Sequence, residues 1–320
     1  MKTEPHRPAA LPYASDPERP VPDVRRKGDA PLRRYRFEFM MMLPALLLLA
    51  AISLFPFVYL IWMSLNTVSL AGGLGFTFVG LDNWLQLFSD PQVGQSWKIS
   101  LIYFACTVGT ELVLGIVVAL ALHALHFGRH LVLSLVLMPI FIAPSIAGLL
   151  GYFLVDPVYG FYGWVLRTLG IFSGNLLGTA SSAMPTLILI DVWQWTPLII
   201  LIVSAGLASL PEDVMEAAKI DGATYFQRLF RIVLPLLAPI ILIALLIRSM
   251  DAIRFFDAIA LTTNGGPADT TKVVAIRLYE TAFRFFHLGY AAAIGLTMLI
   301  FTIVIAKVFL RALSGRELTN

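Results

Sequence analysis

The chain has 320 residues, of which 58% are hydrophobic and only 13% charged. A soluble domain is typically about half apolar and about a quarter charged, so this composition excludes an ordinary soluble protein. The net charge of +3 does not indicate nucleic-acid binding, because no basic motif with interleaved aromatic residues follows the amino-terminal positive charges.

The chain starts with a polar, proline-containing tail, residues 1–36. We predict that this tail is disordered and that it lies in the cytoplasm. A basic cluster beside a membrane span marks the cytoplasmic side. The first apolar run begins only near Phe37, so we expect a retained anchor instead of a cleaved signal peptide. Nine of the 23 Lys and Arg residues lie in this tail: Lys2, Arg7, Arg19, Arg25, Arg26, Lys27, Arg33, Arg34 and Arg36.

Six apolar segments follow, each long enough to cross a bilayer, which needs ~20 residues. Backbone groups in lipid must be hydrogen-bonded internally, so these segments are predicted to be helices. The expected fold is all-α, with a membrane domain over 37–312 and a short cytoplasmic tail over 313–320. The six segments are Phe39–Leu65, Trp97–Leu125, Leu131–Phe153, Ala183–Leu207, Leu229–Phe256 and Leu288–Leu310.

The positive charges between the spans favour both termini in the cytoplasm. The loop 66–96 contains turn residues, and the loop 156–182 contains a short apolar piece, Gly163–Ile171. Cys106 is the single cysteine, which excludes an intrachain disulfide.

The segment between the fourth and fifth spans is polar and carries helix-boundary signals. Pro211, Glu212 and Asp213 are typical of a helix start, and Gly222 is typical of a stop. We therefore predict a short cytoplasmic helix over about 212–222. A surface helix presented in this way suits a groove on a partner protein.

This segment carries the pattern Glu-Ala-Ala, three residues, Gly, nine residues, Ile-x-Leu-Pro, which resembles the signature of permease subunits of binding-protein-dependent ABC importers. The matching residues are Glu216, Ala217, Ala218, Gly222, Ile232, Leu234 and Pro235. The stretch Leu261–Pro267, with Thr270 and Gly289–Ala293, is similar to the carbohydrate branch that includes the maltose and glycerol-3-phosphate permeases. The resemblance covers roughly residues 38–312.

The resemblance implies a type I importer permease in a bacterial plasma membrane, with a coupling helix that docks on a cytoplasmic ATPase. Glu216 would face a basic group there, Ala217 and Ala218 would allow close approach, and Gly222, next to Asp221, would permit a sharp turn. Implied partners are a second permease subunit, usually unlike the first, two ATPase subunits and an extracellular solute-binding protein. The chain has no Gly-x-x-x-x-Gly-Lys-[Ser/Thr] motif, so ATP and Mg²⁺ are expected on the ATPase subunits.

Ionisable residues inside membrane helices indicate where a solute could bind. Counting the helical rise places Asp191, Arg248 and Asp251 in the outer half of the membrane. In the maltose branch the corresponding faces of spans four and five line the sugar site. The candidate pathway residues are Asp191, Gln194, Trp195, Leu198, Arg248, Asp251 and Phe255. The alternative is that Arg248 and Asp251 satisfy each other in helix packing.

Arg248 also raises the hypothesis of a solute with a phosphate, sulfonate or carboxylate group, although a neutral sugar is favoured. Glu111, near the middle of span two, is interpreted as a protonated packing residue or as part of a gate. His123, His126 and His130 have metal-ligand spacing, but at a span end interfacial histidines are the better interpretation. We find no catalytic set and predict no metal and no enzymatic activity in the chain itself.

Two other classes stay open at this point. An ion- or proton-coupled secondary transporter would have broken helices and ionisable residues at mid-membrane. A membrane-bound enzyme would need a nucleophile, a base and an orienting group together. Association with an ATPase would separate the importer from both.

Overall fold

The computed structural model describes residues 31–317, except 70–72, 74 and 126, and side-chain environments from 38 to 314 within that range. Contacts divide the chain into two units, Met1–Pro56 and Phe57–Asn320. Most of the predicted tail, residues 1–30, lies outside the described residues, as do residues 318–320.

The first predicted span is helical throughout. It consists of α1 (Pro31–Leu49), a π-helical turn (Ala50–Leu54) and α2 (Phe55–Ser64). The segment Glu38–Ser64 is long and apolar enough to cross a membrane, and it buries none of its most apolar window in this chain. Its apolar side chains therefore require lipid or another protein around them.

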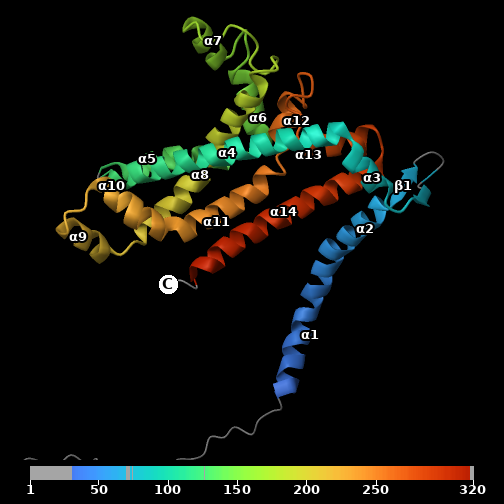
Figure 1. The fold of residues 1–320 in the computed structure, drawn as a ribbon, viewed down its shortest axis with the longest axis horizontal. Coiled ribbons are helices and arrows are strands. Elements are labelled where there is room, and N and C mark those ends of the chain that lie inside the picture. Colours follow the sequence, from blue (N-terminus) through green and yellow to red (C-terminus); the bar gives the residue numbers. More distant parts are fainter. Residues whose placement is uncertain (1–30, 70–72, 74, 126, 318–320) are drawn as a thin grey trace, which may run out of the picture. The chain divides into compact units, whose positions relative to one another are not determined.

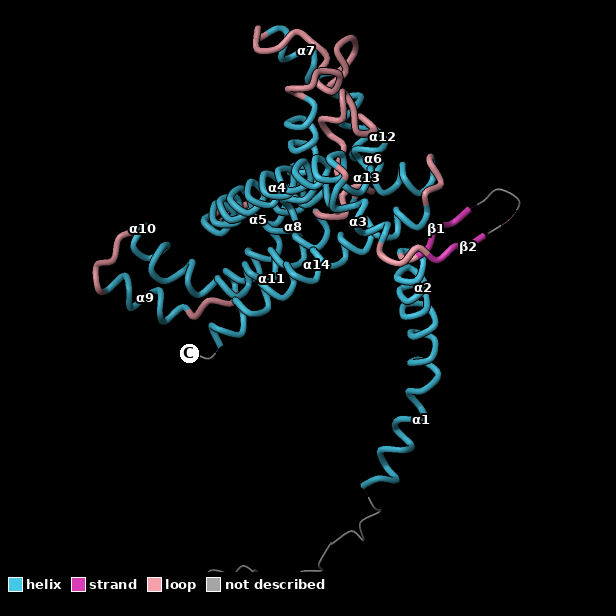
Figure 2. Tube along the Cα trace, turned by 45° about the vertical axis from the view of Figure 1, so that its right-hand side comes forward, coloured by secondary structure: helices cyan, strands magenta, loops and turns pink. Residues whose placement is uncertain are grey.

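The loop after the first span departs from an all-helical architecture. After α2, the strands β1 (Asn66–Ser69) and β2 (Gly75–Phe78) form an antiparallel hairpin in which Asn66 pairs with Phe78 (Figure 2). β-Branched and aromatic residues such as Val68 and Phe76 favour such pairing. A short helix, α3 (Asp82–Ser89), leads to the second span.

Four of the predicted spans are long helices with boundaries close to those expected. The second begins at Pro91 instead of Trp97, because the Asp90 side chain caps it by accepting a hydrogen bond from the Gln92 amide at 2.8 Å. The four are α4 (Pro91–Ala124), α8 (Ala183–Ala208), the continuous helix from α10 (Tyr225–Arg228) through a π-helical turn (Leu229–Val233) into α11 (Leu234–Ala252), and α14 (Leu288–Glu317).

The third predicted span is not one straight helix, which corrects the sequence prediction. Instead α5 (Arg129–Leu137), a 3₁₀ turn (Met138–Phe141) and α6 (Pro144–Leu154) are bent by 99°. Pro144 forces the preceding Ala143 into an extended conformation, with φ −60° and ψ 139°. The described residues thus hold five helices able to span a membrane, or six if the bent pair counts as one.

Helix α8 is the centre of the larger unit, with α4 and α11 packed against it and α14 packed against α11 (Figure 1). Of its most apolar window, 61% is buried within the chain. The close approach of α4 to α8 requires Gly115 on α4, because a Cβ atom at this position would lie 2.6 Å from the Cβ of Ile199 on α8. Spans two, four and five therefore share one core.

The remaining short helices are α7 (Phe161–Thr168), α12 (Asp257–Thr262) and α13 (Val274–Tyr279), followed by a π-helical turn (Glu280–Arg284). The segment between α12 and α14 is tied to α4 by polar contacts. Arg277 donates to Gln92 at 2.9 Å, and the amide of Val274 donates to Ser100 at 2.8 Å. Asp269 pairs with both Lys272 at 2.7 Å and Arg277 at 3.2 Å.

Candidate functional site

The predicted cytoplasmic helix is present as α9 (Glu212–Ile220), between the fourth and fifth spans. Pro211 occupies its N-cap position in an extended conformation, with φ −62° and ψ 124°. Glu212 and Asp213 lie in the first turn and Lys219 in the last, so all three charges are favourably placed relative to the helix dipole. The residues themselves specify an isolated short helix.

A Schellman motif ends α9. Gly222 has a φ of +74°, and its amide donates to the carbonyl of Lys219 at 3.1 Å. The amide of Ala223 donates to the carbonyl of Ala218 at 3.0 Å. Only glycine adopts this left-handed conformation at low cost, which confirms Gly222 as the stop signal.

The chain then turns back into the fifth span. Thr224 and Gln227 form a reciprocal capping box at the start of α10. Pro235, the last residue of the Ile-x-Leu-Pro pattern, lies directly after the π-helical turn Leu229–Val233 in the continuous helix of the fifth span. Its missing amide hydrogen removes one helical hydrogen bond there, and such sites coincide with local irregularities of a helix. The complete motif therefore specifies the exposed helix, its stop and the re-entry into the membrane span.

The motif residues face in two directions. Glu216, Ala217, Asp221 and Gly222 are exposed, whereas Ala218 is buried in its own chain, at 7% exposure. Ala218 thus packs α9 onto the rest of the subunit and Ala217 is on the outer surface. The predicted contacts of these residues with an ATPase stay a prediction.

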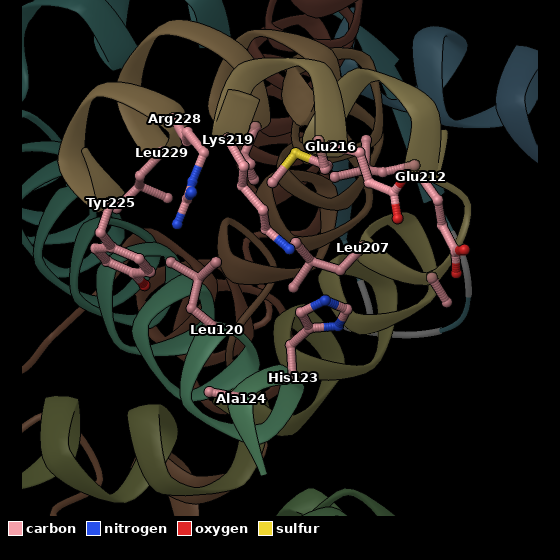
Figure 3. A pocket seen from close by; sticks show the side chains of 14 residues that line it. Leu120, His123, Ala124, Leu207, Glu212, Glu216, Lys219, Tyr225, Arg228 and Leu229 are labelled. Atoms are coloured by element: carbon pink, nitrogen blue, oxygen red, sulfur yellow. The ribbon is translucent and has the colours of Figure 1, made fainter. Parts of the chain in front are cut away.

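A hollow of about 480 Å³ lies between α9, the ends of α4 and α8, and the start of the fifth span, which is formed by α10 and the π-helical turn Leu229–Val233 (Figure 3). Figure 3 shows Lys219 and Arg228 on one side and Glu212 and Glu216 on the other. Its floor includes the apolar side chains of Leu120, Leu207 and Val233. Among the described residues, none of these four charged side chains has an ion-pair partner within 4 Å.

The histidines near this hollow give no support for a metal site. His123 lines the hollow and His126 lies outside the described residues. Among the described residues, no group of three His, Cys, Asp or Glu side chains is arranged to hold a metal ion.

The second candidate region is a charged cluster inside the larger unit. Arg248 on α11 pairs with Glu111 on α4, its Nε lying 2.6 Å from Oε2, and with Asp191 on α8. Its Nη1 lies 3.2 Å from Oδ2 of Asp251, one helical turn further along α11. Arg248, Glu111 and Asp191 have side-chain exposures of 0%. One guanidinium therefore links three helices in the core.

The other predicted pathway residues surround this cluster. The ring of Trp195 lies 5.3 Å from Cζ of Arg248, which is cation–π geometry. Phe255 stacks on Tyr103 with ring centroids 4.9 Å apart. The side-chain amide of Gln194 donates to the carbonyl of Ile142 at 2.9 Å, which satisfies a backbone group at the break in the third span.

Most of these residues are closed off from solvent. Asp191, Gln194 and Arg248 are at most 1% exposed, and Phe255 is 7% exposed. The side chain of Asp251 is 43% exposed, and Trp195 and Leu198 are half-buried. A pathway shared with a second subunit must reach the surface of this one, so in this conformation only Asp251, Trp195 and Leu198 are available to line it. The assignment of the full set stays a prediction.

The polar atoms in or beside the cluster that are buried without a hydrogen-bond partner among the described residues include Oδ1 of Asp191, Oε1 of Gln194 and Nε1 of Trp195. Buried polar atoms are normally paired with protein or ordered water. An unpaired acceptor and an unpaired donor on the same helix turn suit water or the hydroxyl groups of a solute.

Sequence reasoning did not connect Glu111 to this cluster. Glu111 and Arg248 are 137 residues apart, and periodicity on one helix cannot reveal a pair between two helices. The available signal was charge: an arginine at this depth requires an acidic partner, and Glu111 is an acidic residue within a predicted span.

Comparison with known proteins gives consistent results. Residues 24–317 match the family described as "Binding-protein-dependent transport system inner membrane component", a match that extends beyond the predicted 38–312 at both ends. The trehalose/maltose transport system permease protein MalF of Thermococcus litoralis is 32% identical, over 89% of this chain and 95% of that protein. The trehalose transport system permease protein SugA of Mycobacterium tuberculosis is 33% identical, over 86% and 88%.

Among solved structures, a chain of a bacterial ABC transporter involved in the import of the acidic polysaccharide alginate is similar, with a TM-score of 0.78 and 22% identity. The similarity covers 91% of this chain and 98% of that one, and it shows a shared fold. The fold, the complete motif over residues 216–235 and the family match together place this chain in the family of inner-membrane permease components of binding-protein-dependent transport systems.

Proposed function

We propose that this chain is one of two permease subunits of an ATP-driven importer for a sugar or sugar-like solute, and that α9 couples it to a cytoplasmic ATPase. An extracellular binding protein would deliver the solute. The observation that carries the proposal is α9 itself: a capped helix between two membrane spans that presents Glu216 and Ala217 to solvent.

The charges beside the hollow support a docking role. Glu212 and Glu216 have no ion-pair partner within 4 Å among the described residues, so a basic group from a partner could pair with them. Closure of the ATPases would then move α9, and with it the fifth span to which it is joined through Gly222 and the α10 capping box. ATP and Mg²⁺ would be bound by the ATPase subunits.

The sugar assignment is supported by the names of the relatives and by the buried cluster. The compared MalF and SugA proteins are named for trehalose and maltose transport. An aromatic face beside a carboxylate that reaches the surface, as at Trp195 and Asp251, suits a hydroxyl-rich solute.

A secondary transporter would also have a broken span and buried ionisable residues, both of which occur here. The membership in a binding-protein-dependent family and the motif on α9 favour the ATP-driven importer. Both structural features are accounted for in this chain: the break follows Pro144, and the buried charges pair with one another.

The decisive test measures ATP hydrolysis and uptake in vesicles that contain the co-expressed complex, with trehalose and maltose as probes. We expect Glu216→Lys to lower both activities by about tenfold or more, because reversing one charge of an interfacial pair costs several kcal/mol. Asp213→Lys is the matched control, since it makes the same charge change on an exposed position of α9 outside the motif. Equal loss in both variants would refute a specific role of Glu216, and uptake without an associated ATPase would refute the coupling role of α9.

A further inference from the structure

The guanidinium of Arg248 is nearly saturated inside the subunit. Its Nε and Nη2 donate to the two oxygens of Glu111, at 2.6 and 3.0 Å. Nη2 also donates to Asp191, and Nη1 donates to Asp251 at 3.2 Å. Four of its five N–H groups are thus engaged, the two to Glu111 in bidentate geometry. No part of the side chain is exposed.

The part of the cluster that reaches solvent is a carboxylate. The side chain of Asp251 is 43% exposed, whereas Glu111 and Asp191 are fully buried behind it. The nearest other cation is Arg254, which is 67% exposed and lies 4.0 Å from Oδ1 of Asp251. An exposed guanidinium of this kind is strongly screened by water, so it offsets little of the negative charge.

Glu111 determines this arrangement. It is on a different helix from both aspartates and accepts two of the four hydrogen bonds from Arg248, whereas each aspartate accepts one. Without its charge, the single guanidinium would be neutralised less, and its positive potential would reach the Asp251 end of the cluster.

We propose that Glu111 is a positioning residue that sets the charge selectivity of the solute pathway. By holding Arg248 inside the subunit, it leaves a carboxylate at the accessible end of the cluster, so the pathway accepts uncharged sugars and disfavours solutes with a phosphate, sulfonate or carboxylate group. Repulsion of the wrong solute is a common source of specificity. The inference rests on the proposed transport of a sugar.

The test measures the local potential directly. In full-length chain carrying Cys106→Ala and Asp251→Cys, the thiol at 251 is modified by a cationic and an anionic methanethiosulfonate reagent of similar size. The chain, with the partner subunits it recruits, is embedded in nanodiscs so that both membrane faces are open to water. Glu111→Gln is expected to raise the anionic-to-cationic rate ratio on the order of tenfold, because the loss of one nearby negative charge under water-like screening shifts the two rates in opposite directions.

Three controls separate a positional effect from a general loss of structure. Glu111→Asp keeps the charge and should keep the ratio, and Asp213→Asn, at an exposed position of α9 outside the motif, should leave it unchanged. Glu111→Gln combined with Arg248→Gln should lower the anionic-to-cationic rate ratio again, because the double variant also lacks the positive charge of the guanidinium.

The outcomes are distinct from those of the ATPase assay, since labelling needs neither hydrolysis nor a bound solute. An unchanged ratio in Glu111→Gln would overturn the proposal, and so would a thiol at position 251 that neither reagent modifies. Uptake of sn-glycerol 3-phosphate in preference to trehalose by the unmodified complex would also contradict it.

Discussion

The two charged regions of this subunit contain the same residue types in opposite situations. In the cluster around Arg248, the guanidinium, Glu111 and Asp191 are fully buried and paired with one another. On α9 and beside its hollow, Glu212, Glu216 and Lys219 are exposed and, within the described chain, have no ion-pair partner within 4 Å. The first region pairs its charges internally, and the second leaves them unpaired at the surface of the subunit.

The difference separates charges that stabilise the folded subunit from charges that are available to a partner. Removing one member of a buried pair leaves an uncompensated charge in a low-dielectric core and destabilises strongly. Removing an exposed charge has little effect on the stability of the chain itself. Substitutions in the two regions should therefore separate folding from coupling.

The largest expected effect is at the buried cluster. Arg248→Met leaves Glu111 and Asp191 facing each other without a cation, so we expect a loss of about 3–5 kcal/mol in unfolding free energy. Arg254→Met, at 67% side-chain exposure, is the matched control and should change stability by no more than about 0.5 kcal/mol. Thermal unfolding of both purified variants in the same detergent measures the difference. Equal stability of the two variants would show that the cluster is not an internal pair.

A smaller effect is expected at the end of α9. Gly222→Val places a branched side chain at a φ of +74°, which costs about 1–2 kcal/mol and weakens the Schellman motif. The global unfolding temperature should fall only slightly, while hydrogen exchange of the Ala223 and Gly222 amides should accelerate. Gly109→Ala is the control, since a Cβ there meets nothing within 4 Å and helix propensity favours alanine. Unchanged exchange at α9 would contradict the role of Gly222 as the stop.

The smallest effect is expected in the segment before the last span. The ion pair with Lys272 lowers the pKa of Asp269 below its ordinary value. A depressed pKa stabilises the folded state above the unfolded-state pKa, near 4, and this stabilisation is lost as the pH falls through the lower folded-state value.

We therefore expect Asp269→Asn to remove a stabilisation of at most about 1 kcal/mol at neutral pH and to flatten the decline of the unfolding temperature below pH 4. Unfolding temperatures of the variant and the unmodified chain, measured from pH 6 to pH 3, test this. A parallel decline in both proteins would show that Asp269 does not contribute.

The local features of the site could be predicted from the sequence because they depend on neighbouring residues. Pro211, the acidic first turn and Gly222 determine where α9 begins and ends through backbone sterics and local hydrogen bonds. The spans were equally predictable, since a run of ~20 apolar residues crosses the bilayer and forms a helix there to hydrogen-bond its own backbone groups. The break in the third span was missed, although Pro139 and Pro144 are both visible in the sequence, because continuous hydrophobicity was given more weight than the prolines.

By itself, then, the sequence determined the membrane location, the helical segments and the exposed motif helix, all of which follow from composition and short-range geometry. Only the tertiary structure decided that Glu111, 137 residues from Arg248, completes the charged cluster, and that most of the predicted pathway residues are closed off from solvent. The physical reason is that burial and ion pairing depend on how α4, α8 and α11 pack together. The residue periodicity of one helix does not indicate which face of another helix packs against it.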